Sequence, residues 1–158
     1  MKAILDTIIE PALAILPPQM TSRRAKAMML AIGMQESRLV HRKQINGPAR
    51  GLWQFERGGG VAGVLRHPAT RDHAATVCWR LGNAGTTASV YHQLEHDDVL
   101  AACFARLLLW TLPGVLPERG DVAGAWDQYI VAWRPGKPHR HTWDEFYEEA
   151  WATVLGER

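Results

Sequence analysis

Glu36 combines a reactive side chain with an apolar setting. It follows Ile32, Met29 and Ala25 at spacings of four, seven and eleven residues, so these side chains share one face of a predicted helix. The carboxyl group therefore continues an apolar stripe, near a helix C-terminus whose dipole disfavours an anion. Desolvation and the dipole both favour the protonated form, which suits a general acid. The alternative interpretation is a carboxylate at a frayed helix end that turns to solvent.

A glycine-rich segment with an aromatic end follows Glu36 in the chain. Residues 46–55 read NGPARGLWQF. Gly51 would let the backbone approach another group closely, and Gln54 offers both a hydrogen-bond donor and an acceptor. The segment is therefore a candidate binding wall beside the carboxyl group.

Residues 35–55, QESRLVHRKQINGPARGLWQF, resemble the start of the soluble lytic transglycosylase family, within the lysozyme-like superfamily that includes goose-type lysozyme. That family has Glu-Ser at a helix end, then a loop, then Gly-Ala-x-Gly-Leu-x-Gln. The match covers about residues 28–57 and implies that Glu36 is the sole catalytic acid/base. The other residues that it implies are Ser37, which would fix the loop by hydrogen bonding, and Gly51, Leu52 and Gln54, which would line the sugar groove.

The family's second motif, Ala-Tyr-Asn-Ala-Gly at a helix start, is altered in this chain. Its best counterpart is residues 125–129, AWDQY, where Trp replaces Tyr and Asp replaces Asn. Trp126, Asp127 and Tyr129 are therefore candidate substrate-binding residues. Aromatic rings also line sugar sites, although most such rings are core. The candidate sugar platforms, each of which could instead be core, are Trp53, Trp126, Tyr129 and Trp133.

A second carboxylate would decide between two glycosidase mechanisms. Retaining and inverting hydrolases use two carboxyl groups, and Glu56 and Asp127 are the candidates because each lies beside a matched motif. The resemblance implies a mechanism that needs Glu36 alone, which protonates the glycosidic oxygen and then takes a proton from the sugar's own 6-hydroxyl. The sequence leaves hydrolysis and this 1,6-anhydro route open, and we expect Glu56 to be a solvated loop charge. The loop WRPGKP, residues 133–138, is either a surface turn or a substrate contact.

Two other functions fit parts of the sequence. Residues 92–96, HQLEH, match the H-x-x-E-H pattern of zinc peptidases, with His92, Glu95 and His96 as the candidate residues. An aspartate directly after this motif is suited to cap the next helix, so we expect a polar helix end and no metal or other cofactor. The altered second motif also fits a catalytically silent glycan-binding protein of the same superfamily.

The elements that would position these residues are almost all helical. The predicted helices span residues 3–16, 22–37, 68–81, 86–96, 97–110, 121–133 and 142–155. Their predicted caps are Ser22, Asp97 or Asp98, Asp121, and a capping box at Thr142–Glu145. Any short hairpin should lie within the glycine-rich residues 40–63, near the groove. Together they predict one mainly α, lysozyme-like domain over residues 1–158.

Composition and charge exclude several classes of protein. The chain has 158 residues, 47% of them hydrophobic, and a net charge of +2, which is far too weakly basic for a dedicated nucleic-acid binder. Cys78 and Cys103 do not make a disulfide framework, and their apolar helical contexts predict buried free thiols. The sequence contains no segment long and apolar enough to predict a transmembrane span.

The setting is predicted from the N-terminal residues and from the resemblance. Residues 1–18 carry Asp6 and Glu10 inside an apolar run, which favours an amphipathic helix over a signal peptide. Small phage-encoded members of the superfamily are similarly compact, which implies a phage lysin. We expect a monomer that acts on peptidoglycan glycan strands, at the β-1,4 bond between N-acetylmuramic acid and N-acetylglucosamine. It would be made in the host cytoplasm and reach the cell wall in the periplasm through a holin or within a virion.

Overall fold

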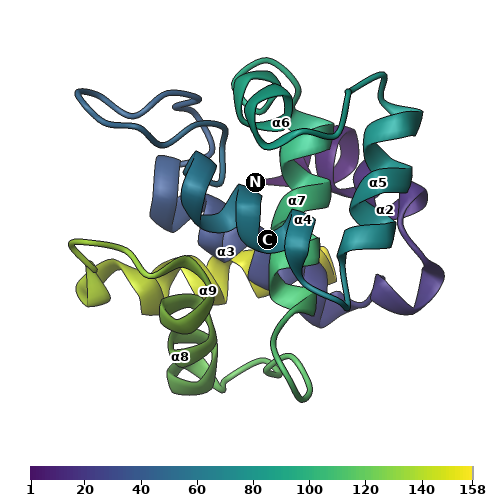
Figure 1. The fold of residues 1–158 in the computed structure, drawn as a ribbon. Coiled ribbons are helices and arrows are strands. Elements are labelled where there is room, and N and C mark those ends of the chain that lie inside the picture. The colour runs from purple at the N-terminus through teal and green to yellow at the C-terminus, as the bar shows by residue number, and fades with distance from the viewer. Residues whose placement is uncertain (158) are drawn as a thin grey trace.

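The fold is built around one central helix, α7, against which six other helical elements pack (Figure 1): η1, α2, α3, α4, α5 and α8. The computed structural model describes residues 1–157. Its helical elements, in chain order, are α1 (Lys2–Ile4), η1 (Leu5–Ile9), α2 (Glu10–Ile15), η2 (Pro18–Met20), α3 (Arg23–Ser37), η3 (Arg57–Val61), α4 (Ala62–Arg66), α5 (Arg71–Arg80), α6 (Thr87–Gln93), α7 (Asp98–Trp110), α8 (Val122–Trp133) and α9 (Arg140–Leu155). All residues from Leu100 to Leu109 of α7 are buried, because this stretch is apolar nearly all round. The helix predicted over residues 97–110 and the mainly α fold are both confirmed.

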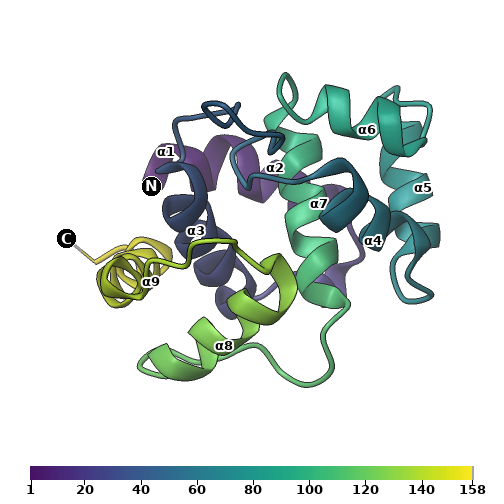
Figure 2. The ribbon, with the colours of Figure 1, turned by 60° about the vertical axis from the view of Figure 1, so that its left-hand side comes forward.

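Three of the predicted helix caps are present. The side chains of Ser22, Asp97 and Asp121 each accept a hydrogen bond from the amide three positions later. They stand at the starts of α3, α7 and α8, and they satisfy amides that have no partner within the helix. Of these helices, α3 lies between α9 and α7 and packs along α9 (Figure 2).

The capping box predicted at Thr142–Glu145 is wrong, because α9 begins at Arg140. The Thr142 hydroxyl instead donates to Oε1 of Gln35 and to the carbonyl of His139. A contact with the end of α3 thus replaces the expected local cap. This contact ties the start of α9 to the helix that carries Glu36.

Residues 2–15 form one continuous helix that is widened in its middle, where η1 has π-helical hydrogen bonding. Pro11 removes an amide from the helical ladder, and the wide turn ends shortly before it. The buried face of this helix consists of Leu5, Ile8, Ile9, Ala12 and Leu13. The amphipathic helix predicted over residues 3–16 is confirmed.

The structure differs from the prediction between residues 57 and 82. The short helix α4 was not predicted, because the glycines at its start have low helix propensity. The next helix, α5, begins at Arg71 instead of at residue 68. It ends before Gly82, whose φ of +69° places it in the left-handed conformation that follows many helices.

The hairpin expected within residues 40–63 is reduced to two isolated antiparallel bridges. Lys43 pairs with Arg50, and Arg50 pairs with Phe55. The amides and carbonyls of Arg50 and Phe55 exchange two hydrogen bonds of 2.9 and 2.8 Å. The segment after α3 is therefore a loop closed by backbone bridges, with no strand among the described residues.

The structure also agrees with the predictions about the two cysteines and about membrane-spanning segments. Cys78 and Cys103 are buried free thiols. Burial raises the pKa of both thiols, that of Cys103 to about 12, so both are protonated at neutral pH. Among the helices of residues 1–157, none has the length and apolar character needed to cross a membrane.

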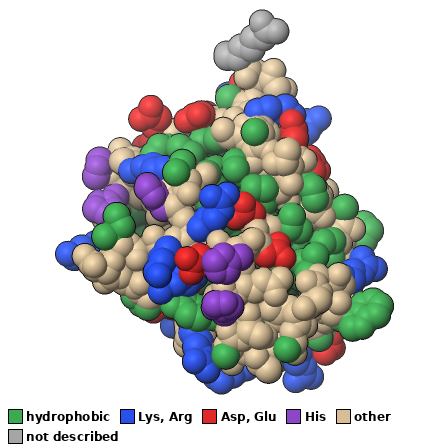
Figure 3. All heavy atoms as spheres, turned by 90° about the horizontal axis from the view of Figure 1, so that it is seen from above, with side chains coloured by type: hydrophobic (Ala, Val, Ile, Leu, Met, Phe, Trp, Pro, Cys, Tyr) green, Lys and Arg blue, Asp and Glu red, His purple; other side chains and the backbone are tan. Residues whose placement is uncertain are grey.

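Charges of both signs lie side by side on the surface. In the view of Figure 3, Lys and Arg side chains alternate with Asp and Glu side chains, and His side chains gather at two places. Salt bridges among the described residues include Arg42–Asp98, Arg50–Glu95, Arg24–Glu118 and Arg119–Glu157. The small net charge is thus distributed over this face and does not form one broad patch on it.

Candidate active site

A cleft of about 1100 Å³ opens beside the C-terminal end of α3. One wall comes from residues 44–67, which form the loop after α3 and the short helix α4. The other wall comes from the end of α8 and the loop that follows it, over residues 129–139. Leu108 and Thr111, at the end of the central helix, also line the cleft. Glu36 enters it from the last turn of α3.

Glu36 meets a tyrosine hydroxyl inside this cleft. Tyr129 of α8 donates a hydrogen bond of 2.5 Å to Oε1 of Glu36. Burial raises the pKa of Glu36 from 4.5 to about 7, and the hydrogen bond from Tyr129 opposes part of this rise. Protonated and ionised forms are therefore both populated near neutral pH. A group that first gives and then takes a proton needs this balance.

An aromatic stack holds Tyr129 in place. Its ring lies on that of Trp143 with centroids 5.1 Å apart and planes at 9°, and Trp143 in turn stacks on Tyr147 at 5.9 Å and 15°. The indole N–H of Trp143 donates to the carbonyl of Val122 at 3.1 Å, which fixes the middle of the stack. Tyr129 is only 2% exposed, so it orients Glu36 and is not the sugar platform that the sequence predicted.

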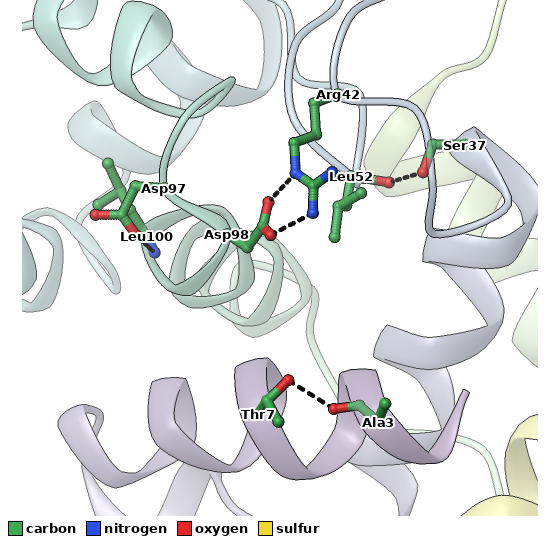
Figure 4. Close-up of polar contacts among 8 residues, drawn as sticks. All are labelled: Ala3, Thr7, Ser37, Arg42, Leu52, Asp97, Asp98 and Leu100. Atoms are coloured by element: carbon green, nitrogen blue, oxygen red, sulfur yellow. Dashed lines mark hydrogen bonds and ion pairs between the residues drawn. The ribbon is translucent and has the colours of Figure 1, made fainter.

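Leu52 and Trp53, which directly precede Gln54 and Phe55 of the cleft wall, are hydrogen-bonded to α3. Ser37 Oγ donates to the carbonyl of Leu52 at 2.6 Å, as Figure 4 shows. The indole N–H of Trp53 donates to the carbonyl of Met29 at 2.8 Å. Both bonds are buried, and they fix the position of this wall relative to the helix that carries Glu36. The supporting hydrogen bond expected of Ser37 is therefore present.

An ion pair fastens the outer part of the same loop to the central helix. Arg42 donates from Nε and Nη2 to the two carboxylate oxygens of Asp98, at 2.8 and 2.7 Å (Figure 4). These hydrogen bonds raise the pKa of Arg42. Asp98 is engaged in this pair, and its neighbour Asp97 caps α7. The loop is thus held at both of its ends.

Three residues predicted to contact sugar are closed to a ligand. Leu52 and Trp53 are 0% exposed, so their side chains belong to the core. Gly51 is buried and does not line the cleft. Its φ is +79°, and a Cβ there would lie 2.9 Å from the carbonyl oxygen of Leu94, so the turn itself requires glycine. The prediction of sugar contact is wrong for these three residues.

Gln54 and Trp133 do line the cleft. Gln54 donates from Nε2 to the carbonyl of Gly51 at 2.9 Å, which fixes the side-chain amide and leaves its oxygen as an acceptor. The indole N–H of Trp133 donates to the carbonyl of Trp53 at 2.8 Å and joins the two walls. Residues 134–137, from the loop WRPGKP, also line the cleft, so this loop lies where a substrate could touch it.

Trp126 and Asp127 do not line the cleft. The ring of Trp126 packs against Tyr129 and Trp143, with centroids 5.4 and 5.7 Å away. Asp127 is exposed, because it lies two positions before Tyr129 and therefore points to the other side of α8. Both predictions of substrate binding are wrong, and Asp127 is not placed to be a second carboxylate. Glu56 lines the cleft and is exposed, so it is the remaining candidate.

Basic side chains outnumber acidic ones along the cleft. The basic residues are Arg66, His67, Arg134, Lys137 and His139, and the acidic residues are Glu36 and Glu56. Arg66 and His67 were not among the predicted site residues, because α4, which positions them, was not predicted. The cleft is therefore suited to a polymer that carries negative charge.

His92 and His96 lie close together, with ring centroids 5.6 Å apart. Glu95 between them forms a salt bridge with Arg50 at 3.5 Å. The helix α6 ends within the motif, at Gln93, three residues before the predicted end. In the part of the chain that the structure describes, no three His, Cys, Asp or Glu side chains are grouped to hold a metal ion. The arrangement gives no support to a zinc peptidase.

The chain matches no family model, no curated protein and no solved structure. The resemblance to lytic transglycosylases therefore stays a prediction from the motif residues. The cleft itself provides a protonatable acid, a wall fixed to α3 and an excess of basic side chains.

Proposed function

We propose that this protein is a peptidoglycan-degrading glycosidase in which Glu36 is the general acid/base. The observation that carries the proposal is the hydrogen bond between Tyr129 and Glu36 within a large cleft. A carboxyl group whose pKa is about 7 can protonate a leaving group at neutral pH and can accept a proton afterwards. The motif around Glu36 supports the same role.

The proposed reaction begins when Glu36 protonates the oxygen of a β-1,4 bond between N-acetylmuramic acid and N-acetylglucosamine. The bond from the anomeric carbon to this oxygen breaks, and positive charge develops on the sugar ring. Glu36, now a carboxylate, takes the proton of the hydroxyl that attacks the anomeric carbon. Attack by the sugar's own 6-hydroxyl gives a 1,6-anhydro end, whereas attack by water gives a reducing end. The hydrogen bond from Tyr129 stabilises the carboxylate between the two proton transfers.

The size and charge of the cleft support a glycan substrate of this kind. Pockets for small ligands measure about 300–1000 Å³, so a cleft of about 1100 Å³ has room for several sugar units. The stem peptides of peptidoglycan carry carboxylates, which suit the positions of Arg66, Arg134 and Lys137. The free amide oxygen of Gln54 can accept a hydrogen bond from an acetamido N–H.

Mass spectrometry of digested peptidoglycan tests the proposal. Purified sacculi would be treated with the wild type, with Glu36→Gln, and with Glu149→Gln as a matched control. Glu149 is exposed on α9 and does not line the cleft. We expect the wild type and Glu149→Gln to release the same fragments, and Glu36→Gln to release none while its circular dichroism spectrum is unchanged. Fragments released by Glu36→Gln would contradict the proposal.

The mass of the new ends separates the mechanisms that the proposal includes. Anhydro ends, lighter by one water molecule, would favour a transglycosylase that uses Glu36 alone. Reducing ends would favour a hydrolase, and Glu56→Gln would then test the second carboxylate. Glycan binding without cleavage by the wild type would favour a catalytically silent glycan-binding protein. The setting of a phage lysin, reaching the wall through a holin or within a virion, stays a prediction.

A further inference from the structure

Residues 134–139, called the basic segment below, line the cleft but have little hydrogen bonding of their own. At the first end of the segment, the amide of Arg134 donates to the carbonyl of Ile130 at 3.0 Å. Residues 135–138 make no backbone–backbone hydrogen bond among the described residues, and two of them are prolines, which lack an amide proton. The segment is therefore held at its ends, and the second of these is His139.

Gln35 of α3 provides the anchor at the second end. Its Nε2 donates to the carbonyl of His139 at 2.9 Å, and its Oε1 accepts from the Thr142 hydroxyl at 2.9 Å. The same hydroxyl lies 3.0 Å from the carbonyl of His139 and donates to it as well. Both polar atoms of the Gln35 side chain are thus used to fix this point. Figure 2 shows the chain between α8 and α9 passing α3 here.

The basic segment presents two cations to the cleft. Arg134 and Lys137 are exposed and line the cleft, and neither takes part in a salt bridge among the described residues. Their charges are therefore available to a ligand. Because the chain between the two anchors lacks backbone hydrogen bonds, the position of Lys137 depends on the anchors on either side of it.

Gln35 and its neighbour Glu36 serve different parts of the cleft. Side chains of adjacent residues in an α-helix point about 100° apart. Glu36 accepts its hydrogen bond from Tyr129, whose ring is stacked on Trp143. The hydrogen bonds of Gln35 go instead to the end of the basic segment and to the start of α9. Removing them leaves the contact between Glu36 and Tyr129 in place.

We propose that Gln35 is a positioning residue, which holds the basic segment so that Arg134 and Lys137 can bind carboxylates of the substrate. The inference rests on the glycan substrate proposed above, and it assigns this wall to the carboxylates of the stem peptides. Gln35 acts through the segment. Its loss should weaken the binding of charged glycan strands and leave the proton transfers of Glu36 unchanged.

Co-sedimentation with purified sacculi measures this binding, with Glu36→Gln in every variant so that the glycan stays intact. Gln35→Met keeps the length of the side chain and removes both hydrogen bonds, so it should weaken binding by about tenfold. Gln19→Met is the matched control, because Gln19 is exposed in η2 and does not line the cleft. Equal binding with and without Gln35→Met, or an equal loss in the control, would overturn the inference alone. No binding to sacculi, together with no cleavage by the wild type, would contradict the proposed function and this inference with it.

Sacculi whose carboxylates have been converted to amides separate positioning from a general loss of structure. They offer no carboxylate to the basic segment, so Gln35→Met should not weaken binding to them. On untreated sacculi Lys137→Gln should also weaken binding, and the double variant should lose less than the product of the two single losses. An equal tenfold loss on amidated sacculi, or fully independent effects of the two substitutions, would overturn the proposal.

Kinetics on soluble glycan strands with stem peptides test whether Gln35 acts on Glu36 instead. In a chain that keeps Glu36, Gln35→Met should raise KM by about tenfold and leave kcat and the alkaline limb of the pH–rate profile unchanged. Thr142→Val should also raise KM, whereas Thr142→Ser, which keeps the hydroxyl, should not. A lower kcat at unchanged KM, or a moved limb, would overturn the proposal. If Gln35→Met does not fold, the two Thr142 variants decide.

Discussion

Replacing Glu36 with glutamine should make the protein more stable at neutral and alkaline pH. Burial raises the pKa of this carboxyl group from 4.5 to about 7, so folding disfavours its ionised form. Glutamine has nearly the same shape and can still accept the hydrogen bond from Tyr129. It has no charge to desolvate. The residue that the proposed reaction requires is therefore unfavourable for the fold at the pH at which it would work.

The size of this effect follows from the two pKa values. Between them, the folded protein binds more protons than the unfolded chain, so the stability of the wild type falls as the pH rises through this range. A pKa raised from 4.5 to about 7 corresponds to about 3 kcal/mol of unfolding free energy, lost between about pH 4 and about pH 8. In a chain of 158 residues this is a difference of roughly 6–12 °C in Tm.

Urea denaturation at a series of pH values measures the effect. The unfolding free energy of Glu36→Gln minus that of the wild type should increase by about 3 kcal/mol from acidic to alkaline pH. Glu149→Gln, which changes an exposed carboxylate on α9, should show no such increase. A difference that stays constant with pH would refute the reasoning, because Glu36 would then have an ordinary pKa in the folded protein.

Three other substitutions test further parts of the structure. Tyr129→Phe removes the hydrogen bond that lowers the pKa of Glu36, so the alkaline limb of the pH–rate profile should move to higher pH; an unmoved limb would contradict this contact. Gly51→Ala should lower the unfolding free energy by about 1–2 kcal/mol or more in urea denaturation, because φ is +79° and the new Cβ would lie 2.9 Å from the carbonyl oxygen of Leu94. Gly63→Ala, in a helix with no atom within 4 Å of the added Cβ, should instead raise it by about 0.5–1 kcal/mol in the same assay. Equal effects of the two alanines would contradict the close approach at Gly51.

Local patterns in the sequence predicted most of the helices. Ser22, Asp97 and Asp121 cap helices through contacts that span three positions, and such contacts can be recognised without knowledge of the fold. The start of α9 was missed because Thr142 bonds to Gln35, which is 107 positions away in the chain. No local pattern reports a contact of that range.

The site was predicted only in part, because some of its features follow from local spacing in the sequence and others from contacts between distant residues. The helical phase of Glu36 predicted that it is shielded from solvent, and the structure half-buries it in the cleft, but its contact with Tyr129 spans 93 positions. The outward position of Asp127 could have been derived, since two residues along a helix correspond to about 200° of rotation. Trp143 and Tyr147 are four residues apart, so their shared face on α9 was also accessible from spacing alone.

The aromatic stack behind Tyr129 has a consequence for the order in which the protein becomes active. Glu36 is translated before Trp143 and Tyr147, which belong to α9 and hold its hydroxyl partner. A chain still attached to the ribosome, with residues 140–155 not yet synthesised, has the acid but not the stack that orients Tyr129 beside it. The catalytic centre proposed here thus forms only after α9 has been synthesised, and a chain cut short before Trp143 lacks the stack that orients the acid.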